Sequence, residues 1–444
     1  MKPLFYLLSL KISGIKNIEV PIELNFYKKT INNDFNPEKY RIKAIYGENG
    51  SGKTAIITAV KILQNFLTDK NYLADSENQK ALKETINKKK HTGSIECEFY
   101  ADFLGKKNIL KYTIAFEVGA DGRCYILNEK LEEKNGNYTK NNYNTVFETA
   151  NGILLKFGEG ELFNETKEKS LNLLNMQTFA VSIFTMKDLK DKYRQNNEMY
   201  YLPLLILFGL SLNVNIDEAD DHKNYFLREE IKTLALSEAG EGDEKLFSHL
   251  MDWGNSGQIG ANLIVKSKFE KFEKKISRMC AFVQIFKPEL CDIVIEKKDY
   301  DKFYKYNLQM VYEGYTLDQE FESRGIKKIM ELFEYLDMSA NGQITFIDEL
   351  DANINDVYLD KLIEYFILYG NGQLCFTAHN LSPMSLLKRN KESINFISSI
   401  NTVHTWANNG NQTPARAYRN GFIEDSPFNV DASDFLGILG GDDE

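Results

Sequence analysis

The chain has 444 residues, of which 43% are hydrophobic and 27% are charged, so it can bury a sizeable core and is too long for one minimal domain. Its formal net charge of −10 disfavours a protein that coats nucleic acid non-specifically, since that activity needs clustered Lys and Arg. Five dispersed cysteines without a CxxC pair are typical of a reducing compartment, and the longest apolar run, at 201–210, is far shorter than the ~20 residues of a membrane span. We therefore expect a cytoplasmic protein that is not inserted in a membrane.

The N-terminal part of the chain has the pattern of strands followed by a glycine-rich loop. Strands are expected at 4–12, 20–26 and 42–46, and apolar residues at helical spacing predict a helix at 54–66. From about 94 to 157 the apolar residues alternate with period two, between turn sequences rich in Gly and Asn. This stretch predicts an antiparallel β meander.

Residues 165–290 have a mostly helical pattern. The clearest segment is Val265 to Phe286, whose apolar residues recur at spacings of four and three before Pro288 ends the pattern. Two interpretations stay open: a helix packed in an antiparallel bundle within the chain, or a dimerising coiled coil.

From 292 onward strands return and alternate with helices. Short buried strands are expected at 344–347 and 374–377, with helices after Gly325 and at about 356–368. This alternation is typical of an α/β protein with a parallel sheet.

A phosphate-binding motif follows the strand at 42–46. The segment Gly47-Glu-Asn-Gly-Ser-Gly-Lys-Thr54 satisfies G-x-x-x-x-G-K-[ST], with a strand before it and a helix after it. Its glycines let backbone N–H groups converge on phosphate oxygens at the positive end of the helix. Lys53 would reach the β- and γ-phosphates, and the hydroxyl of Thr54 would bind Mg²⁺. The expected ATP ligands are Gly47, Asn49, Gly50, Ser51, Gly52, Lys53 and Thr54.

Two further strands end in residues that suit hydrolysis. The strand at 344–347 runs into Asp348 and Glu349, at the sheet edge where ligands bind in open α/β sheets. Asp348 would hold Mg²⁺, and Glu349 would orient and activate the attacking water. The strand at 374–377 leads to His379, which could bond the γ-phosphate or the water; the alternative is a strand-end histidine of no consequence.

The segment Ser323-Arg-Gly325 precedes a helix and offers a second anion site through a hydroxyl, backbone amides and a helix N-terminus. The P-loop already serves one nucleotide, so this second site would suit the nucleotide of a neighbouring chain. The alternative is a plain helix start.

The order of P-loop, long insertion, Ser-x-Gly helix, Asp-Glu pair and strand-end histidine resembles the ABC-type ATPases. It is most similar to the branch with the SMC and double-strand-break-repair ATPases and the OLD-like ATPases of bacterial defence. The resemblance implies an α/β fold with a mixed or parallel sheet, an antiparallel β meander and a helical insertion. It also implies that Lys16 approaches the nucleotide and that Ser323 and Gly325 form a degenerate signature. Asp351 falls at the D-loop, and Gln177 is the candidate Q-loop ligand of Mg²⁺.

This resemblance divides the chain into three parts. Residues 1–165 would be the N-terminal half of the ATPase domain, 166–290 a helical insertion, and 291–444 the C-terminal half. The insertion is too short for SMC-type coiled coils, and the segment after His379 is too short for the Toprim nuclease of OLD-family proteins. We therefore expect an ATPase without an effector of its own.

The leading hypothesis is an ATP-hydrolysing subunit of an anti-phage, abortive-infection-type defence system. It would form a homodimer or higher oligomer with ATP at the interface and regulate a separately encoded effector, such as a nuclease or toxin. The alternative is a DNA repair or recombination ATPase of the SMC-like class. Its candidate DNA contact is the basic cluster formed by Lys80, Lys83 and the run Lys88-Lys-Lys-His91, for which the alternative is a solvated loop. A transporter subunit fits less well, because the signature is degenerate and the insertion is long.

Overall fold

The computed structural model of the chain describes residues 3–426, with gaps at 29–30, 32–34, 137–141, 217–261, 301–302, 353, 391 and 408–411. None of the described helices is both long enough and apolar enough to cross a membrane.

The centre of the molecule is a six-stranded sheet in the order β17-β16-β3-β15-β14-β9. Five neighbouring strands run parallel, and β17 pairs antiparallel at one edge. The strands are β3 (Ile42–Tyr46), β9 (Leu212–Asn215), β14 (Ile344–Ile347), β15 (Gln373–Thr377), β16 (Ile394–Ile397) and β17 (Val403–Thr405). Every residue of the five parallel strands is buried, as expected where helices or a second sheet cover both faces. The strands predicted at 42–46, 344–347 and 374–377 are confirmed.

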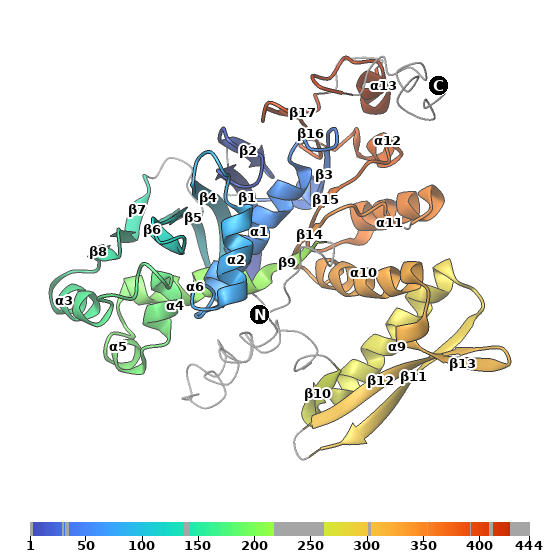
Figure 1. The fold of residues 1–444 in the computed structure, drawn as a ribbon, viewed down its shortest axis with the longest axis horizontal. Coiled ribbons are helices and arrows are strands. Elements are labelled where there is room, and N and C mark those ends of the chain that lie inside the picture. The colour runs from blue at the N-terminus through green and yellow to red at the C-terminus, as the bar shows by residue number, and fades with distance from the viewer. Residues whose placement is uncertain are drawn as a thin grey trace, which may run out of the picture.

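Helices cover one face of this sheet and share one apolar core with it. They are α10 (Arg324–Ala340), α11 (Asp356–Tyr369), α12 (Pro383–Leu387) and α13 (Pro414–Arg419). Figure 1 shows α10, α11 and α12 in orange, beside the sheet strands.

The opposite face carries helices and a second sheet, joined to it in another apolar core. The helices packed there are α1 (Lys53–Thr68), α4 (Phe179–Phe184) and α6 (Asn197–Ser211). The second sheet has seven strands in the order β2-β1-β4-β5-β6-β7-β8, each paired antiparallel to its neighbours. These are β1 (Leu4–Ser13), β2 (Ile22–Asn25), β4 (Thr92–Phe103), β5 (Lys106–Val118), β6 (Cys124–Asn135), β7 (Asn144–Ala150) and β8 (Ile153–Phe157). The predicted meander is confirmed.

The side chain of Gln373 adds hydrogen bonds between the two sheets. The amide of Gln373, on β15, both donates to the carbonyl of Leu7 and accepts from its N–H, each at 2.9 Å. Leu7 lies on β1, so this pair ties the meander to the strand that leads to His379. Beyond β3, α2 (Ser76–Thr85) follows α1 and leads into β4.

The segment 166–290 is not a single helical insertion. The helices α3 (Gly160–Lys169), α4, α5 (Lys187–Lys192) and α6 come first, and β9 then joins the central sheet. After the gap at 217–261, a separate lobe contains α9 (Phe269–Phe286) and the strands β10 (Leu263–Val265), β11 (Leu290–Asp299), β12 (Phe303–Tyr312) and β13 (Tyr315–Asp318). Figure 1 shows this lobe in yellow, below α10.

Helix α9 differs from both interpretations of its heptad-like spacing. Its apolar residues Phe272, Ile276, Met279 and Val283 are buried in a core shared with β11, β12 and α10. Val265 lies on β10 and not on the helix. This row of apolar residues on α9 therefore covers a small antiparallel sheet. The bundle and the dimerising coiled coil are both wrong for this segment, because its apolar face is already buried.

Candidate functional site

The P-loop connects β3 to α1 and has the shape of an anion site. Gly50 and Gly52 have φ values of 81° and 111°, a left-handed region that residues with a Cβ rarely adopt. The ammonium of Lys53 donates to the carbonyls of Gly47 at 2.8 Å and Glu48 at 3.0 Å. The hydroxyl of Ser51 is buried and has no partner among the described residues. A charged donor and an unsatisfied buried hydroxyl at a helix N-terminus fit the phosphates of a nucleotide.

The electrostatics of Lys53 link the P-loop to the predicted acidic residues. Burial lowers the pKa of Lys53, and the carboxylates of Asp348, Glu349 and Asp351 act in the opposite direction. These acidic residues follow β14, two strands away from β3 in the sheet. The fold therefore brings Lys53 and the Asp348-Glu349 pair to one sheet edge, as the sequence predicted.

Thr377, at the end of β15, organises the acidic pair and was missed from the sequence. Its hydroxyl donates to Oδ1 of Asp348 at 2.5 Å and accepts from the backbone N–H of Glu349 at 2.8 Å. Glu349 has a φ of 49°, a conformation that costs free energy for a residue with a side chain. The hydrogen bond from its N–H to Thr377 helps to hold Glu349 in this conformation. The sequence shows Thr377 only as the last residue of an apolar strand.

Glu349 and His379 face each other across this edge. The Nε2 atom of His379 lies 3.9 Å from Oε1 of Glu349, and both side chains are about half exposed. Two side chains that can exchange protons with water thus lie next to each other and next to the P-loop.

A hollow of about 380 Å³ opens between the P-loop and the His379 loop. It is lined by Tyr46, Gly47, Glu48, Asn49, Ala378, His379, Leu381 and Tyr418. Asn49, predicted as a nucleotide ligand, thus lines the same hollow as His379.

The N-terminal loop with Lys16 lies against the P-loop. The side-chain amide of Asn17 donates to the carbonyl of Gly50, and Ile18 lies beside Gly52. The backbone N–H of Lys16 donates to the carbonyl of Thr85 at 2.6 Å. The structure thus places the loop that carries Lys16 next to the P-loop, and the predicted role of Lys16 stays a prediction.

Ser323 and Gly325 are at the start of α10. The Ser323 hydroxyl accepts from the N–H of Ile326 at 3.3 Å and so caps its own helix, while the space around Gly325 is open. Helix α10 runs antiparallel to β14, because a short turn joins them and Thr345 donates to the carbonyl of Tyr335. Its N-terminus therefore points toward the edge that carries the P-loop, but no described bond joins Ser323 to that loop.

Gln177 is not brought to the site. Its side-chain oxygen accepts from the hydroxyl of Ser182, and the next residue, Thr178, donates to the carbonyl of Phe66. Phe66 is 13 residues after Lys53 on α1, or ~20 Å along the helix at 1.5 Å per residue. The prediction that Gln177 binds Mg²⁺ is therefore wrong.

The strand beside Asp348 offers a different polar residue. Asn215 ends β9, and its carbonyl accepts from the N–H of Asp348 at 2.9 Å. Its side-chain Oδ1 is buried and has no partner among the described residues. This position has little signal in the sequence, because β9 has four residues and directly follows the apolar helix α6.

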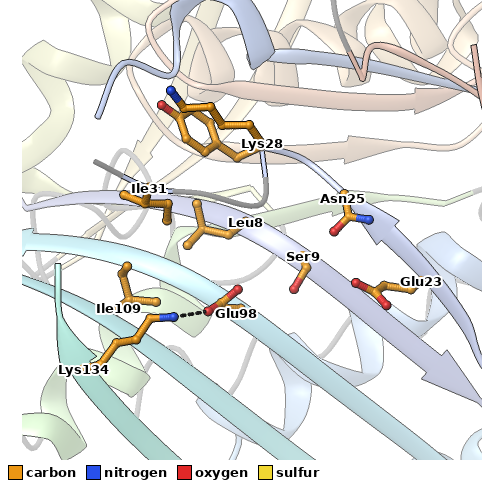
Figure 2. Close-up of a pocket in the computed structure, with 10 residues that line it drawn as sticks. Leu8, Ser9, Glu23, Asn25, Lys28, Ile31, Glu98, Ile109 and Lys134 are labelled. Carbon is orange, nitrogen blue, oxygen red and sulfur yellow. Dashed lines mark hydrogen bonds and ion pairs between the residues drawn. The ribbon is translucent and has the colours of Figure 1, made fainter. Parts of the chain in front are cut away.

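A second hollow, of about 290 Å³, lies on the seven-stranded sheet and is shown in Figure 2. Its wall includes the ion pair between Lys134 and Glu98, whose atoms are 3.1 Å apart. Two of the charges on this wall, Lys134 and Glu98, pair with each other, whereas the P-loop has the unsatisfied buried hydroxyl of Ser51. The P-loop is therefore the better candidate of the two for binding an anion.

Two solved structures of the recombination mediator protein RecF in the RecFOR pathway are similar to this chain. The RecF-ATPrS structure is 14% identical, with 91% of this chain and 99% of that chain covered, at a TM-score of 0.40. The RecF-ATP structure is 14% identical, with 91% and 100% covered, at a TM-score of 0.37. No protein-family model and no curated protein sequence matches the chain.

Proposed function

We propose that the chain binds ATP with Mg²⁺ and hydrolyses it to ADP and phosphate. The observation that supports this most directly is the meeting of three motifs at the ends of three adjacent parallel strands. The P-loop follows β3, the Asp348-Glu349 pair follows β14, and His379 follows β15 between them. Ligands bind at this edge in open α/β sheets.

Each residue has a role that follows from its place. Lys53 and the loop amides bind the phosphates, while Thr54 and Asp348 hold Mg²⁺, which would neutralise charge on the phosphate oxygens. The half-exposed carboxylate of Glu349 orients a water and accepts its proton. Nε2 of His379 lies 3.9 Å from Oε1 of Glu349, so His379 can donate a hydrogen bond to the same water or to the γ-phosphate.

The test is the substitution Glu349→Gln, which keeps the size of the side chain and removes the base. It should retain ATP binding and lower kcat by about a hundredfold or more. Lys53→Ala should lose binding as well. The matched control is Glu168→Gln, an exposed glutamate on α3, which should hydrolyse ATP like the wild type. Equal turnover in wild type and Glu349→Gln would overturn the role of Glu349.

We further propose that a second copy of the chain completes this site. Ser323 and Gly325 lie at an open helix start turned toward the P-loop edge and are not bonded to the P-loop in the described chain. A neighbouring chain could bring them to the phosphates, so that ATP would lie at a homodimer interface.

Action on DNA is the second candidate function, and the position of the basic cluster supports it. Lys80 and Lys83 lie on α2, and the loop after it carries Lys88, Lys89 and Lys90. The same loop holds Lys16: the Asn87 amide donates to the Lys16 carbonyl at 2.8 Å. A surface that could contact phosphates is therefore bonded to the loop beside the nucleotide. Duplex binding that weakens steeply with salt and depends on ATP would support this function.

The defence role with a separately encoded effector stays a prediction, because no feature of the described residues favours it over action on DNA. The surfaces where we would expect an effector to dock are the helical block at 265–286 and the tail at 409–444. Residues 409–411 and 427–444 lie outside the described residues, and the apolar face of α9 is buried. A pull-down with the neighbouring gene product in the Glu349→Gln background, with and without ATP, distinguishes the two. Recovery of a nuclease or toxin in one nucleotide state favours defence, and duplex binding without such a partner favours the DNA function.

A further inference from the structure

The side of α11 turned away from the sheet is an exposed apolar surface. The opposite side of the same helix, with Leu359, Ile363 and Phe366, is buried in the core. The exposed apolar residues are Val357 (68%), Tyr358 (38%), Tyr365 (45%), Leu368 (61%) and Tyr369 (66%). Single exposed apolar residues are ordinary, but a contiguous set on one helix face marks an interaction site. Tyrosine is also enriched where proteins bind each other. We call this set, with Lys361 and Glu364, the α11 face.

The centre line of the α11 face has the spacing of a helix-pairing seam. Val357, Lys361, Glu364 and Leu368 follow each other at intervals of four, three and four residues, which places them in one row along the helix. The two ends of the row are apolar, and its centre carries one positive and one negative side chain. Lys361 and Glu364 form an ion pair with each other at 2.7 Å and are 75% and 44% exposed.

This row is complementary to itself when it is read in the opposite direction. If a second α11 lies antiparallel, with the two-fold axis midway between Lys361 and Glu364, each Lys361 faces the Glu364 of the other copy. Each Val357 then faces a Leu368. A two-fold interface requires that one patch match itself, and this order of residues meets the requirement in both charge and apolarity.

We propose that the α11 face is the docking site for the α11 face of a second copy of this chain, packed antiparallel. The tyrosines Tyr358, Tyr365 and Tyr369 lie along one flank of the row, where the ring of Tyr358 packs against Phe286 of α9. This interface is separate from the shared ATP site, because it uses neither the P-loop nor Ser323. It therefore forms without nucleotide.

The first test measures the mass of the full chain by sedimentation velocity without nucleotide, across a concentration series. Leu368→Glu places a charge at the apolar end of the row and should convert the dimer to monomer. The matched control is Leu171→Glu, an equally exposed leucine (62%) outside the α11 face, which should stay dimeric. Circular dichroism and ATP binding show whether each variant is folded. A wild-type monomer in the absence of nucleotide, or equal behaviour of the two variants, overturns the proposal.

The second test uses charge reversal. K361E alone or E364K alone puts like charges opposite each other, so the dissociation constant should rise by about tenfold or more, and less at high salt. An equimolar mixture of the two variants restores both opposite-charge pairs between chains, although neither chain has its own ion pair. The mixture should therefore dimerise at protein concentrations at which each variant alone is mostly monomeric. Failure of the mixture to dimerise, or a different protein bound to the α11 face, overturns the docking of a second copy.

Discussion

The carboxylate of Asp351 holds the loop that carries His379. Its Oδ2 atom accepts from the backbone N–H groups of His379, at 2.9 Å, and Asn380, at 2.6 Å. Asp351 follows Glu349 by two residues, so it bonds the end of β14 to the end of β15. The distance between Glu349 and His379 therefore depends on Asp351, although Asp351 need not touch the reacting water.

Asp351→Ala should lower kcat by about 10- to 100-fold and leave the KM for ATP nearly unchanged. The physical reason is that the P-loop stays intact while His379 loses its fixed place, and small displacements of positioned groups cost rate. Asp351→Asn keeps one neutral acceptor, so its kcat should fall less than that of Asp351→Ala. Steady-state ATPase kinetics measure both effects.

A control variant and a double variant check that Asp351→Ala lowers kcat by displacing His379. Asp121→Ala, on an exposed hairpin turn, should be as active as the wild type. The double variant Asp351→Ala/His379→Ala should lose no more than the larger single loss, because both changes affect one unit. Fully additive losses would contradict the link between the two residues.

Thr377→Val should also lower kcat, because it removes the hydroxyl that bonds both Asp348 and the N–H of Glu349. A backbone N–H left without a partner costs about 1–3 kcal/mol, and Glu349 would then leave its left-handed conformation. Thr377→Ser keeps the hydroxyl and should retain most of the activity. The measurement is ATP turnover together with the Mg²⁺ concentration required for half-maximal rate.

The control for Thr377 is Thr113→Val, which removes a hydroxyl bonded to Glu96 on the meander, away from the P-loop. It should leave turnover and Mg²⁺ dependence as in the wild type. If Thr377→Ser, which keeps the hydroxyl, loses as much turnover as Thr377→Val, the loss cannot be assigned to the hydroxyl.

A mixture of two inactive chains tests whether the ATP site is shared. Lys53→Ala removes the phosphate ligand, and Ser323→Arg blocks the exposed helix start. In a random mixture half of the dimers are mixed, and each has one intact site, so activity should recover to about a quarter of the wild-type value. Activity should also rise faster than linearly with protein concentration. No recovery, with linear activity at all concentrations, would show that α10 begins with an ordinary cap.

Much of the site could be predicted from the sequence because each motif follows a short apolar run. Parallel strands buried on both faces appear as such runs, and their ends meet at one edge, so Lys53, Asp348 and His379 could be expected together. Thr377 could not, since its role depends on which strand lies beside β14. Gln177 was assigned by its place in the chain, and packing against the far end of α1 removed it from the site.

The spacing of α9 likewise showed an apolar face without showing what covers it. A repeat of four and three residues fits a coiled coil, a bundle or a sheet, and the partner in this case is β11 and β12. The strand β9 was missed because four apolar and amide residues after a long apolar helix give no period of their own.

Glu129, on β6, is a buried acid that makes stability depend on pH. It is 1% exposed, and its carboxylate accepts from the Tyr112 hydroxyl at 3.0 Å and from the N–H of Phe179 at 2.6 Å. Burial raises the pKa of Glu129 to about 7, although both hydrogen bonds act to lower it. The folded state therefore holds this proton more tightly than the unfolded state. The resulting stability is fully present below the unfolded pKa and is lost as the pH rises through about 7.

Glu129→Gln should remove this dependence, because the amide stays neutral at every pH and can still accept the bond from Phe179. Relative to the wild type, the variant should gain free energy of unfolding between pH 5 and pH 8, by up to about 3 kcal/mol for a pKa shift of this size. Urea unfolding of both proteins at several pH values measures the gain. The control is Glu132→Gln, on the same strand: burial raises the pKa of Glu132, but the bonds from Lys111 and Lys130 lower it further. Glu132 is thus ionised across this window, so Glu132→Gln should lose a constant amount of stability. If the free energies of unfolding of Glu129→Gln and the wild type change equally between pH 5 and pH 8, Glu129 keeps an ordinary pKa in the folded protein.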